Sequence, residues 1–236
     1  MWRKSVISSP AEILYADERL LAVRKPPGVH VHPTRLTPGE LSLTDLLAPE
    51  WGYLWPVHRL DRPTSGAVVL ARDAQAASDL ARQWRERLVV KIYHAVLRGW
   101  LEEAQSTDRL VKKERKGEAN LTALTEFRPL ELWEPPWPWH GFLSLRVTLA
   151  EVQPHTGRRH QIRQHARGLA HPILGDTVWG DTALNSFVQE RSALDRLCLF
   201  CRRLEFVHPE AGTPVVIEAP PTTEEMALLN RLKNGS

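Results

Sequence analysis

The 236-residue chain has only two cysteines and no long apolar segment. No uninterrupted apolar run approaches the roughly 18 residues that a membrane-spanning helix needs. Residues 1–18 contain basic side chains but no apolar core of signal-peptide length. These absences argue against membrane-embedded and secreted classes of protein, and they predict a cytoplasmic location.

The two cysteines, Cys198 and Cys201, stand in the sequence LCLFCRRL. Such a pair is compatible with half a zinc site or a redox centre, but no second pair is present to complete a four-thiolate site. The apolar run LCLF favours a strand, on which residues three apart face opposite ways. We therefore expect buried, unreactive cysteines and no disulfide.

Acidic residues are missing from two stretches, although the chain has 28 of them and a formal net charge of only +3. Between Glu50 and Asp73 the only acid is Asp61, and between Glu151 and Asp176 there is none. The basic residues of these stretches include His58, Arg59, Arg62, Arg72, Arg158, Arg159, His160, Arg163, His165, Arg167 and His171. They indicate one positively charged surface, with two separate solvated basic faces as the alternative.

Apolar periodicity predicts hairpins, strands and helices in irregular alternation. Strands are expected at 12–15, 20–25, 67–72, 89–100, 142–152, 197–200 and 215–219, and helices from Ser42, after Asp73, at 158–167 and at 223–233. This order predicts an α+β fold with a mixed or mostly antiparallel central sheet and flanking helices. We expect one domain over residues 1–236.

Three of these segments carry more detailed predictions. The helix after Asp73 should bury Ala77, Leu80, Ala81, Trp84 and Leu88. The strand at 142–152 should bury Leu143, Leu145, Val147 and Leu149 on one face. The Pro/Trp segment Glu134–Gly141 reads as an irregular loop, whose tryptophans either stack on RNA bases or, as we favour, pack on their own domain.

Asp61 stands on a turn just before the apolar strand 67–72, in the sequence HRLDRPTSG. Neighbouring arginines favour the ionised form of its carboxylate, and a loop carboxylate delivered by a rigid strand can act as nucleophile or base. The alternative is a structural ion pair with Arg59 or Arg62.

HRLDRPTSG closely resembles the catalytic signature of the RluA-type family of pseudouridine synthases. Three further matches follow in the expected order: KIYHAVLRGW at 91–100, HTGRRHQIRQH at 155–165 and HPILGD at 171–176. Residues 13–28 also resemble the opening hairpin of the family. The resemblance spans about residues 12–219 and implies a pseudouridine synthase fold with an active-site cleft, acting as a single catalytic domain without an N-terminal S4-type RNA-binding domain.

The resemblance implies a role for each matching residue. Asp61 is the aspartate required to cleave the bond between uracil and ribose, and Tyr93 stacks on the target base and is linked to loss of the proton on its fifth carbon. Arg163 is the basic residue that pairs with the aspartate, and Arg59 enters the RNA stack where the target base leaves. The remaining RNA-binding candidates are His58, Arg62, Arg158, Arg159 and Arg167.

The basic segment at 158–167 adds two local predictions. On a helix, Arg159 and Arg163 would lie one turn apart on one face, so that one could meet Asp61 and the other a phosphate. Backbone N–H groups at Thr156-Gly157 would be open to a phosphate as well.

The implied reaction isomerises a uridine inside folded RNA to pseudouridine and needs no metal or organic cofactor. Within the family, the motifs are most similar to those of enzymes that modify tRNA. The resemblance therefore implies a uridine 65-type target on the acceptor/T-arm side of tRNA. The alternatives are a 23S rRNA synthase of the same family and a non-catalytic RNA-binding protein. We expect a monomer without a membrane partner. The sequence does not distinguish between attack of Asp61 on the sugar, attack on the base and a route through a glycal.

Overall fold

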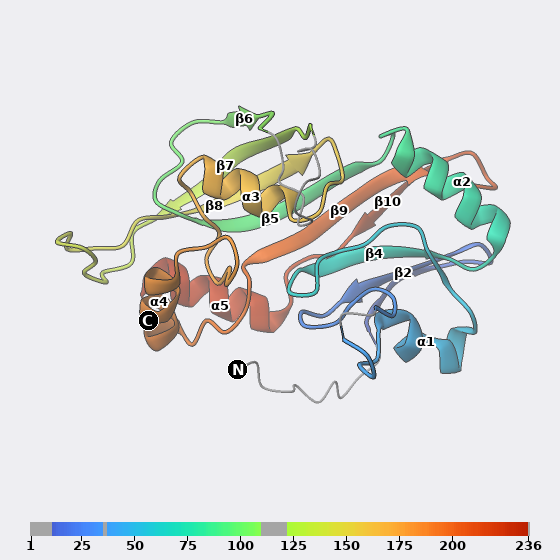
Figure 1. Cartoon of the computed structure of the whole chain (residues 1–236), viewed down its shortest axis with the longest axis horizontal. Helices are drawn as coiled ribbons and strands as arrows, with labels where there is room; N and C mark the ends of the chain where they lie inside the picture. Colours follow the sequence, from blue (N-terminus) through green and yellow to red (C-terminus); the bar gives the residue numbers. More distant parts are fainter. Residues whose placement is uncertain (1–10, 35–36, 110–121, 236) are drawn as a thin grey trace. The chain divides into compact units, whose positions relative to one another are not determined.

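A computed structural model describes residues 11–34, 37–109 and 122–235. The chain divides into two compact units (Figure 1). Unit 1 comprises the chain up to Lys91 together with Cys201–Ala219, and unit 2 comprises Ile92–Phe200 together with the chain from Pro220. Strands β5 (Val90–Arg98) and β9 (Leu199–Val207) each begin in one unit and end in the other. The expectation of a single catalytic domain stays a prediction.

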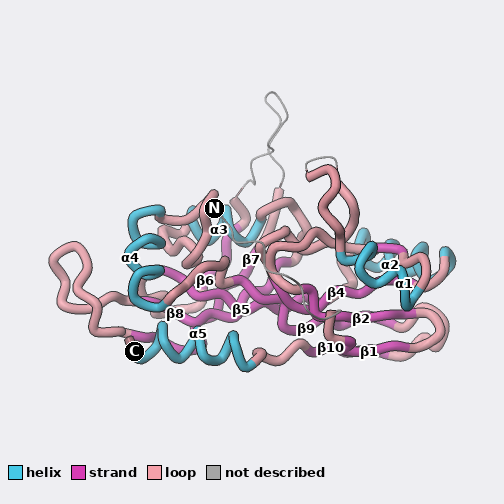
Figure 2. Tube along the Cα trace, turned by 90° about the horizontal axis from the view of Figure 1, so that it is seen from below, coloured by secondary structure: helices cyan, strands magenta, loops and turns pink. Residues whose placement is uncertain are grey.

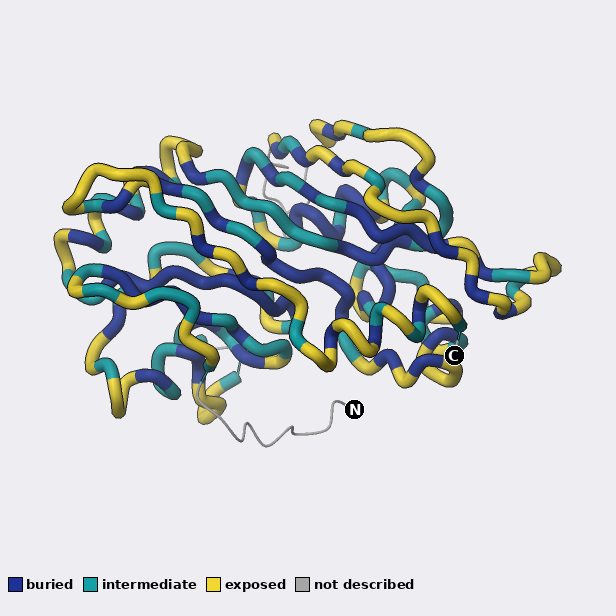
Figure 3. Tube along the Cα trace, turned by 180° about the vertical axis from the view of Figure 1, so that it is seen from behind, coloured by how far each residue is buried: buried dark blue, intermediate teal, exposed yellow. Residues whose placement is uncertain are grey.

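Unit 1 is built on antiparallel strands. Its strand order is β1-β2-β4-β9, with β10 paired to β9 and β3 to β4. The bounds are β1 Ile13–Ala16, β2 Leu20–Lys25, β3 Trp55–Pro56, β4 Ser65–Ala71 and β10 Pro214–Glu218, with helices α1 Leu43–Trp51 and α2 Ala74–Arg85. Every residue of β4 is buried (Figure 3), which fits its unbroken apolar sequence.

The helices of unit 1 begin at the residues that the sequence predicts. Ser42 caps α1 in a reciprocal arrangement, because its hydroxyl accepts from the Asp45 N–H and the Asp45 carboxylate accepts from the Ser42 N–H. Asp73 caps α2 by accepting from the Ala76 N–H at 2.9 Å. Side-chain oxygen atoms thus satisfy backbone donors that have no partner within the helix.

Unit 2 orders its strands as β5-β8-β7-β6, and the pairings are antiparallel. The bounds are β6 Gln105–Thr107, β7 Thr125–Trp133, β8 Val147–Pro154, α3 Gln161–Gly168, α4 Thr182–Ser192 and α5 Thr223–Asn234. Helix α3 packs on β7 and β8, and α5 packs on β7 and α4. Figure 2 shows α3 and α5 on opposite faces of these strands. Both units combine helices with antiparallel strands, so the α+β prediction is confirmed.

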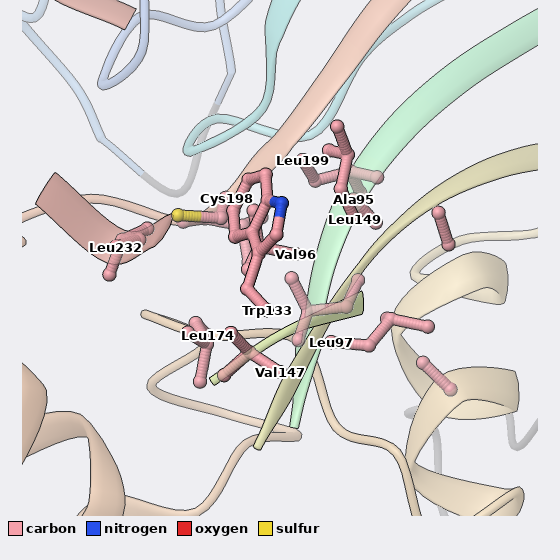
Figure 4. Packing of buried hydrophobic residues seen from close by; sticks show 14 of the residues in the cluster. Ala95, Val96, Leu97, Trp133, Val147, Leu149, Leu174, Cys198, Leu199 and Leu232 are labelled. Atoms are coloured by element: carbon pink, nitrogen blue, oxygen red, sulfur yellow. The ribbon is translucent and has the colours of Figure 1, made fainter. Parts of the chain in front are cut away.

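The hydrophobic core of unit 2 gathers around Trp133 at the end of β7 (Figure 4). Val96 and Leu97 of β5 and Val147 of β8 line it, all with 1% exposure or less. Cys198 lies in this core with its sulfur toward Leu232 of α5. Burial raises the pKa of the Cys198 thiol to about 12, which makes it unreactive. Cys198 and Cys201 are both buried, as predicted, and no disulfide joins them.

Leu88 is 61% exposed, so the prediction that it extends the buried stripe of α2 is wrong. The helix ends at Arg85, and Arg87 adopts a positive φ of 62°, which turns the chain before Leu88 can continue the helical spacing. Gln83 is buried instead. Its side-chain amide donates to the Val207 carbonyl at 2.8 Å and accepts from the Val207 N–H at 2.9 Å.

The strand predicted at 142–152 begins only at Val147. Leu143, expected on its buried face, is 90% exposed. The preceding residues form the end of a hairpin between β7 and β8, so their alternation does not correspond to a sheet face. Trp137 is buried and Trp139 packs against the core of unit 2, which confirms that the Pro/Trp segment packs on its own unit.

The sequence pattern did not predict α4 (Thr182–Ser192). Asp181 caps it by accepting from the Leu184 N–H. The charged stretch 102–120 contains β6, and residues 110–121 lie outside the described residues. Among the residues that the structure describes, no helix has the length and apolar character to cross a membrane.

Candidate active site

Asp61 lies on a hydrogen-bonded turn that leads into β4 of unit 1. The Thr64 N–H donates to the Asp61 carbonyl oxygen at 3.0 Å, which closes the turn over Arg62 and Pro63. Thr64 and Ser65 are buried, whereas Asp61 is partly exposed. Asp61 therefore stands on a turn directly before a rigid buried strand, as the sequence predicts.

A buried lysine holds this turn in place. Lys25 has no exposed surface, and its ammonium donates to the carbonyl oxygens of Pro26 at 2.8 Å, Val29 at 2.8 Å and Arg62 at 3.1 Å. The Gly28 N–H also donates to the Arg62 carbonyl, at 2.8 Å. An ammonium group has three N–H donors, so these oxygens match its capacity and offset the cost of burying the charge.

The sequence pattern places Lys25 at the end of the strand expected at 20–25 and gives it no further role. The structure adds that this lysine organises the turn that carries Asp61. The signal was a lysine as the last residue of an apolar strand, in a position where the β pattern places a buried side chain. Sequence pattern alone does not say which carbonyl groups such an ammonium will meet.

Gly66 fixes the start of β4 by its lack of a side chain. Its φ of +115° lies in a region that favours glycine. A Cβ at this position would lie 2.1 Å from the carbonyl oxygen of Cys201 in β9. The close approach of these backbones requires glycine at the end of the HRLDRPTSG motif.

Positive charge surrounds the Asp61 turn. Arg59 is exposed, and the Arg62 guanidinium contacts Glu40 at 2.8 Å and the Gly28 carbonyl at 2.9 Å. Burial, followed by the charges of Arg62 and Arg59, lowers the pKa of His30 below its ordinary value. The same effects of burial and Arg59 lower the pKa of His32. The Arg62 contacts show that this arginine has a carboxylate partner other than Asp61.

His58 points into unit 1. Its Nε2 accepts from the Val69 N–H of β4 at 2.9 Å, and its ring stacks on Trp84 of α2 with centroids 4.6 Å apart. Burial, and then the charge of Lys91, lowers the pKa of His58 to about 3, so the ring is neutral and can accept this hydrogen bond. These contacts anchor the segment before Asp61, and the predicted contact of His58 with RNA stays a prediction.

Tyr93 belongs to unit 2, where it lies on β5 opposite Val152 of β8. Its ring is half-buried and packs against the core of that unit. The prediction of a period-two strand over this segment is confirmed by the register of β5 with β8. The sheet therefore fixes the backbone of Tyr93.

Arg163 of α3 forms a buried bidentate ion pair with Asp176. Its Nε and Nη2 lie 2.7 Å from the two carboxylate oxygens, and the side chains are 4% and 1% exposed. The same carboxylate accepts from the N–H groups of Val178 and Trp179, each at 2.9 Å. Burial alone would raise the pKa of Asp176, but these donors outweigh it and hold the pKa below its ordinary value.

Asp176 is a functional candidate that the sequence pattern did not single out, although it ends the motif HPILGD. The Asn185 side chain of α4 brackets it, accepting from the Gly175 N–H and donating to the Asp176 carbonyl, both at 2.9 Å. An Arg–carboxylate pair uses two of the five guanidinium N–H donors. Arg163 is thereby held in one orientation by residues of its own unit.

The start of α3 differs from the prediction. The helix begins at Gln161, and His160 adopts a left-handed φ of 55°, so Arg159 precedes the helix and does not share a helical face with Arg163. The Arg158 N–H donates to the Gln161 side chain at 3.0 Å, and is therefore not open to a phosphate. Arg159 and Arg167 are exposed, and Arg158 is half-buried, with its Nε donating to the Thr122 carbonyl at 3.3 Å.

Within the described residues, no three histidine, cysteine or acidic side chains are grouped in a way that would hold a metal ion.

Comparison with known proteins now identifies the class. Residues 19–167 match the family model described as RNA pseudouridylate synthase. The tRNA pseudouridine synthase C of Vibrio cholerae is 40% identical over 219 residues, which cover 88% of this chain and 90% of the relative. The enzyme of the same name from Salmonella typhimurium is 37% identical over 88% of this chain and 84% of its own length.

Two solved human structures are also similar. RNA pseudouridylate synthase domain containing 4 has a TM-score of 0.71 at 27% identity, covering 94% of this chain and 92% of that one. Domain containing 1 has a TM-score of 0.71 at 26% identity, covering 89% and 83%. The chain belongs to the RNA pseudouridylate synthase family. It is an RNA pseudouridine synthase, an isomerase of uridine in RNA.

Proposed function

We propose that this enzyme converts a uridine of tRNA, at a uridine 65-type position on the acceptor/T-arm side, to pseudouridine. The observation that carries the proposal is the 40% identity over nearly the whole of a relative named for tRNA. The enzyme would act as a monomer, in the cytoplasm. The alternative substrate, 23S rRNA, is an outcome of the experiment below.

In the proposed reaction the bond between N1 of uracil and C1′ of ribose breaks, and a bond between C5 and C1′ forms. C5 loses a proton and N1 gains one, so the composition of the nucleotide does not change. Asp61 supplies the carboxylate for cleavage, and its support is the presentation of this group on a turn held by Lys25. Routes through the sugar, the base or a glycal all use this carboxylate.

Tyr93 and Arg163 have supporting roles in this proposal. The Tyr93 ring stacks on the target base, which keeps the detached uracil beside the ribose until it rejoins. Arg163 stabilises the ionised Asp61, and its support is the fixed guanidinium orientation that Asp176 imposes. Neither role needs a metal ion.

The exposed arginines would bind the RNA. Arg59 replaces the target base in the stack and offsets part of the cost of flipping, which is a few kcal/mol. Arg159 and Arg167 are exposed on unit 2 and can meet phosphates. Arg62 and Arg158 each keep part of the guanidinium for internal contacts, so their share of phosphate binding should be smaller.

The proposed substrate is tested by mapping pseudouridine in tRNA and rRNA transcripts treated with the purified enzyme. The expected result is a single new pseudouridine on the acceptor/T-arm side of tRNA and none in 23S rRNA. Asp61→Asn protein, treated identically, provides the background. A new pseudouridine confined to the rRNA would overturn the tRNA assignment while leaving the enzyme class intact.

A further inference from the structure

The hairpin between β7 and β8 ends in a tight, ordered turn. Trp139 and Phe142 exchange two backbone hydrogen bonds of 3.0 Å. His140 and Gly141 between them have positive φ values of 47° and 85°, as a two-residue hairpin turn of the favoured type requires. The tip is therefore a defined structure, and it extends away from the body of unit 2 (Figure 1).

Several contacts fix the base of this hairpin to unit 2. The Trp139 ring packs on Phe187 of α4 with centroids 4.6 Å apart, and the buried Trp137 indole donates to the Gly235 carbonyl at 3.1 Å. The Leu145 N–H donates to the Pro135 carbonyl at 3.1 Å. Trp137 and Trp139 thus pack on unit 2, and other side chains of the hairpin face outward.

The outward side chains are apolar and basic. Phe142 is 63% exposed and Leu143 is 90% exposed, although both stand on an ordered hairpin. The Arg146 guanidinium lies 4.2 Å from the Trp100 ring centroid and 6.0 Å from that of Phe142. An open apolar surface on a fixed element is characteristic of an interaction site.

We propose that Phe142, Leu143 and Arg146 form a second RNA-contact site, which binds an unpaired nucleotide of the same RNA substrate. The Phe142 ring offers a stacking face for the base, and the half-exposed Arg146 side chain offers its guanidinium to the phosphate. The nearby carboxylate of Glu134 is 3.9 Å from Arg146 and accepts a hydrogen bond from Ser144. This inference rests on the proposed function of the enzyme.

The position of this second site fits a folded RNA. Within unit 2, Tyr93 of β5 lies opposite Val152 of β8, and Arg98 lies opposite Val147. The hairpin joins the sheet at Val147. Tyr93 and Arg98 are five residue steps apart along β5, about 17 Å at 3.3 Å per step. The hairpin leaves the sheet at this end of the strand, so the second site would meet nucleotides other than the one at Tyr93.

The test compares two RNAs: a full-length tRNA transcript and an isolated stem–loop transcript of its T arm. Phe142→Ala should raise the Kd for the full tRNA about tenfold, in the range expected when one base–aromatic stack is removed. Its Kd for the stem–loop should match that of the wild type. Phe142→Trp should restore binding, and Arg146→Ala should weaken the same interaction.

Leu88→Ala is the matched control, because Leu88 is 61% exposed on unit 1 and should alter neither Kd. An unchanged Kd of Phe142→Ala for both RNAs would overturn the second RNA-contact site. The exposed apolar surface at Phe142 and Leu143 would then be assigned to binding a protein. Equal weakening with both RNAs would also overturn it. The two Kd values are measured without turnover, so they test the second site separately from the activity of the wild type, which tests the proposed substrate.

Discussion

Asp176 holds Arg163 through two parallel 2.7 Å hydrogen bonds, in a pair that is almost completely buried. The carboxylate also accepts from two backbone N–H groups, so its own position is fixed. If Arg163 stabilises the Asp61 carboxylate during the reaction, its orientation depends on a residue that need not contact RNA. Asp176 is then a positioning residue.

Asp176→Asn should lower the free energy of unfolding by about 3 kcal/mol, because it removes one partner of a buried charge pair. It should also lower kcat while changing KM little, since Asp176 is not among the residues expected to bind RNA. Urea unfolding and steady-state kinetics measure the two effects. Asp181→Asn is the control: Asp181 pairs with Arg98 at 2.8 Å in a more exposed place, and should cost under about 1 kcal/mol. Wild-type kcat in Asp176→Asn would remove the positioning role.

Lys25→Met should loosen the Asp61 turn. The substitution keeps the length of the side chain but leaves the carbonyl groups of Pro26, Val29 and Arg62 without this donor. We expect a decrease of about 3 kcal/mol in the free energy of unfolding, and a fall in kcat that exceeds any change in Kd for RNA. Lys233→Met is the control, because Lys233 forms an exposed ion pair with Glu131. It should leave the free energy of unfolding and kcat nearly unchanged. Unaltered kcat in Lys25→Met would separate this lysine from the turn.

The protonation of His58 should couple stability to pH. Its folded pKa, about 3, lies below the unfolded value near 6.5. Its contribution is therefore complete above pH 6.5 and declines as the pH falls from 6.5 toward 3. The slope is about 1.4 kcal/mol per pH unit, because the unfolded state binds the extra proton.

Unfolding in urea at pH 7.5 and pH 5.5 checks this coupling in the wild type and in His58→Gln. Glutamine can still accept from the Val69 N–H but does not titrate. Between the two pH values, the free energy of unfolding of the variant should fall by about 1.4 kcal/mol less than that of the wild type. Identical decreases would mean that the ring of His58 is accessible to protons in the folded state.

Arg158 and Arg167 should bind phosphates of the RNA. Replacing both by alanine should weaken RNA binding and reduce the slope of log Kd against log salt by roughly one unit for each phosphate that is no longer neutralised. Titrations at several salt concentrations give the slope. Arg128→Ala, at an exposed pair with Glu151, is the matched arginine variant and should leave the slope alone. An unchanged slope in the double variant would place both arginines off the RNA surface.

Local rules in the sequence predicted much of this fold. Ser42 and Asp73 start their helices because a capping oxygen is a local requirement. The burial of β4 follows from its unbroken apolar run. Leu88 and Leu143 were misplaced because backbone turns at Arg87 and at His140-Gly141 ended the periodic pattern.

The sequence predicted some residues of the candidate site and missed others, because only some of their roles depend on neighbours in the sequence. Asp61, Tyr93 and Arg163 were singled out as candidates because contiguous motifs carry them. Asp176 and Lys25 gain their roles from partners distant in sequence: Asp176 meets Arg163 on another element, and Lys25 meets the Arg62 carbonyl 37 residues away. Tertiary contacts of this kind have no local signature.

We propose that the Asp61 carboxylate performs the isomerisation. Tritium release from tRNA labelled at C5 of uridine measures it directly, with Kd determined on the same protein. Asp61→Asn should release no tritium above background while binding RNA within about tenfold of the wild type, because the substitution removes a reacting group and leaves the phosphate-binding arginines in place. Tritium release at the wild-type rate, or a weakening of RNA binding in proportion to the decrease in activity, would contradict the assignment.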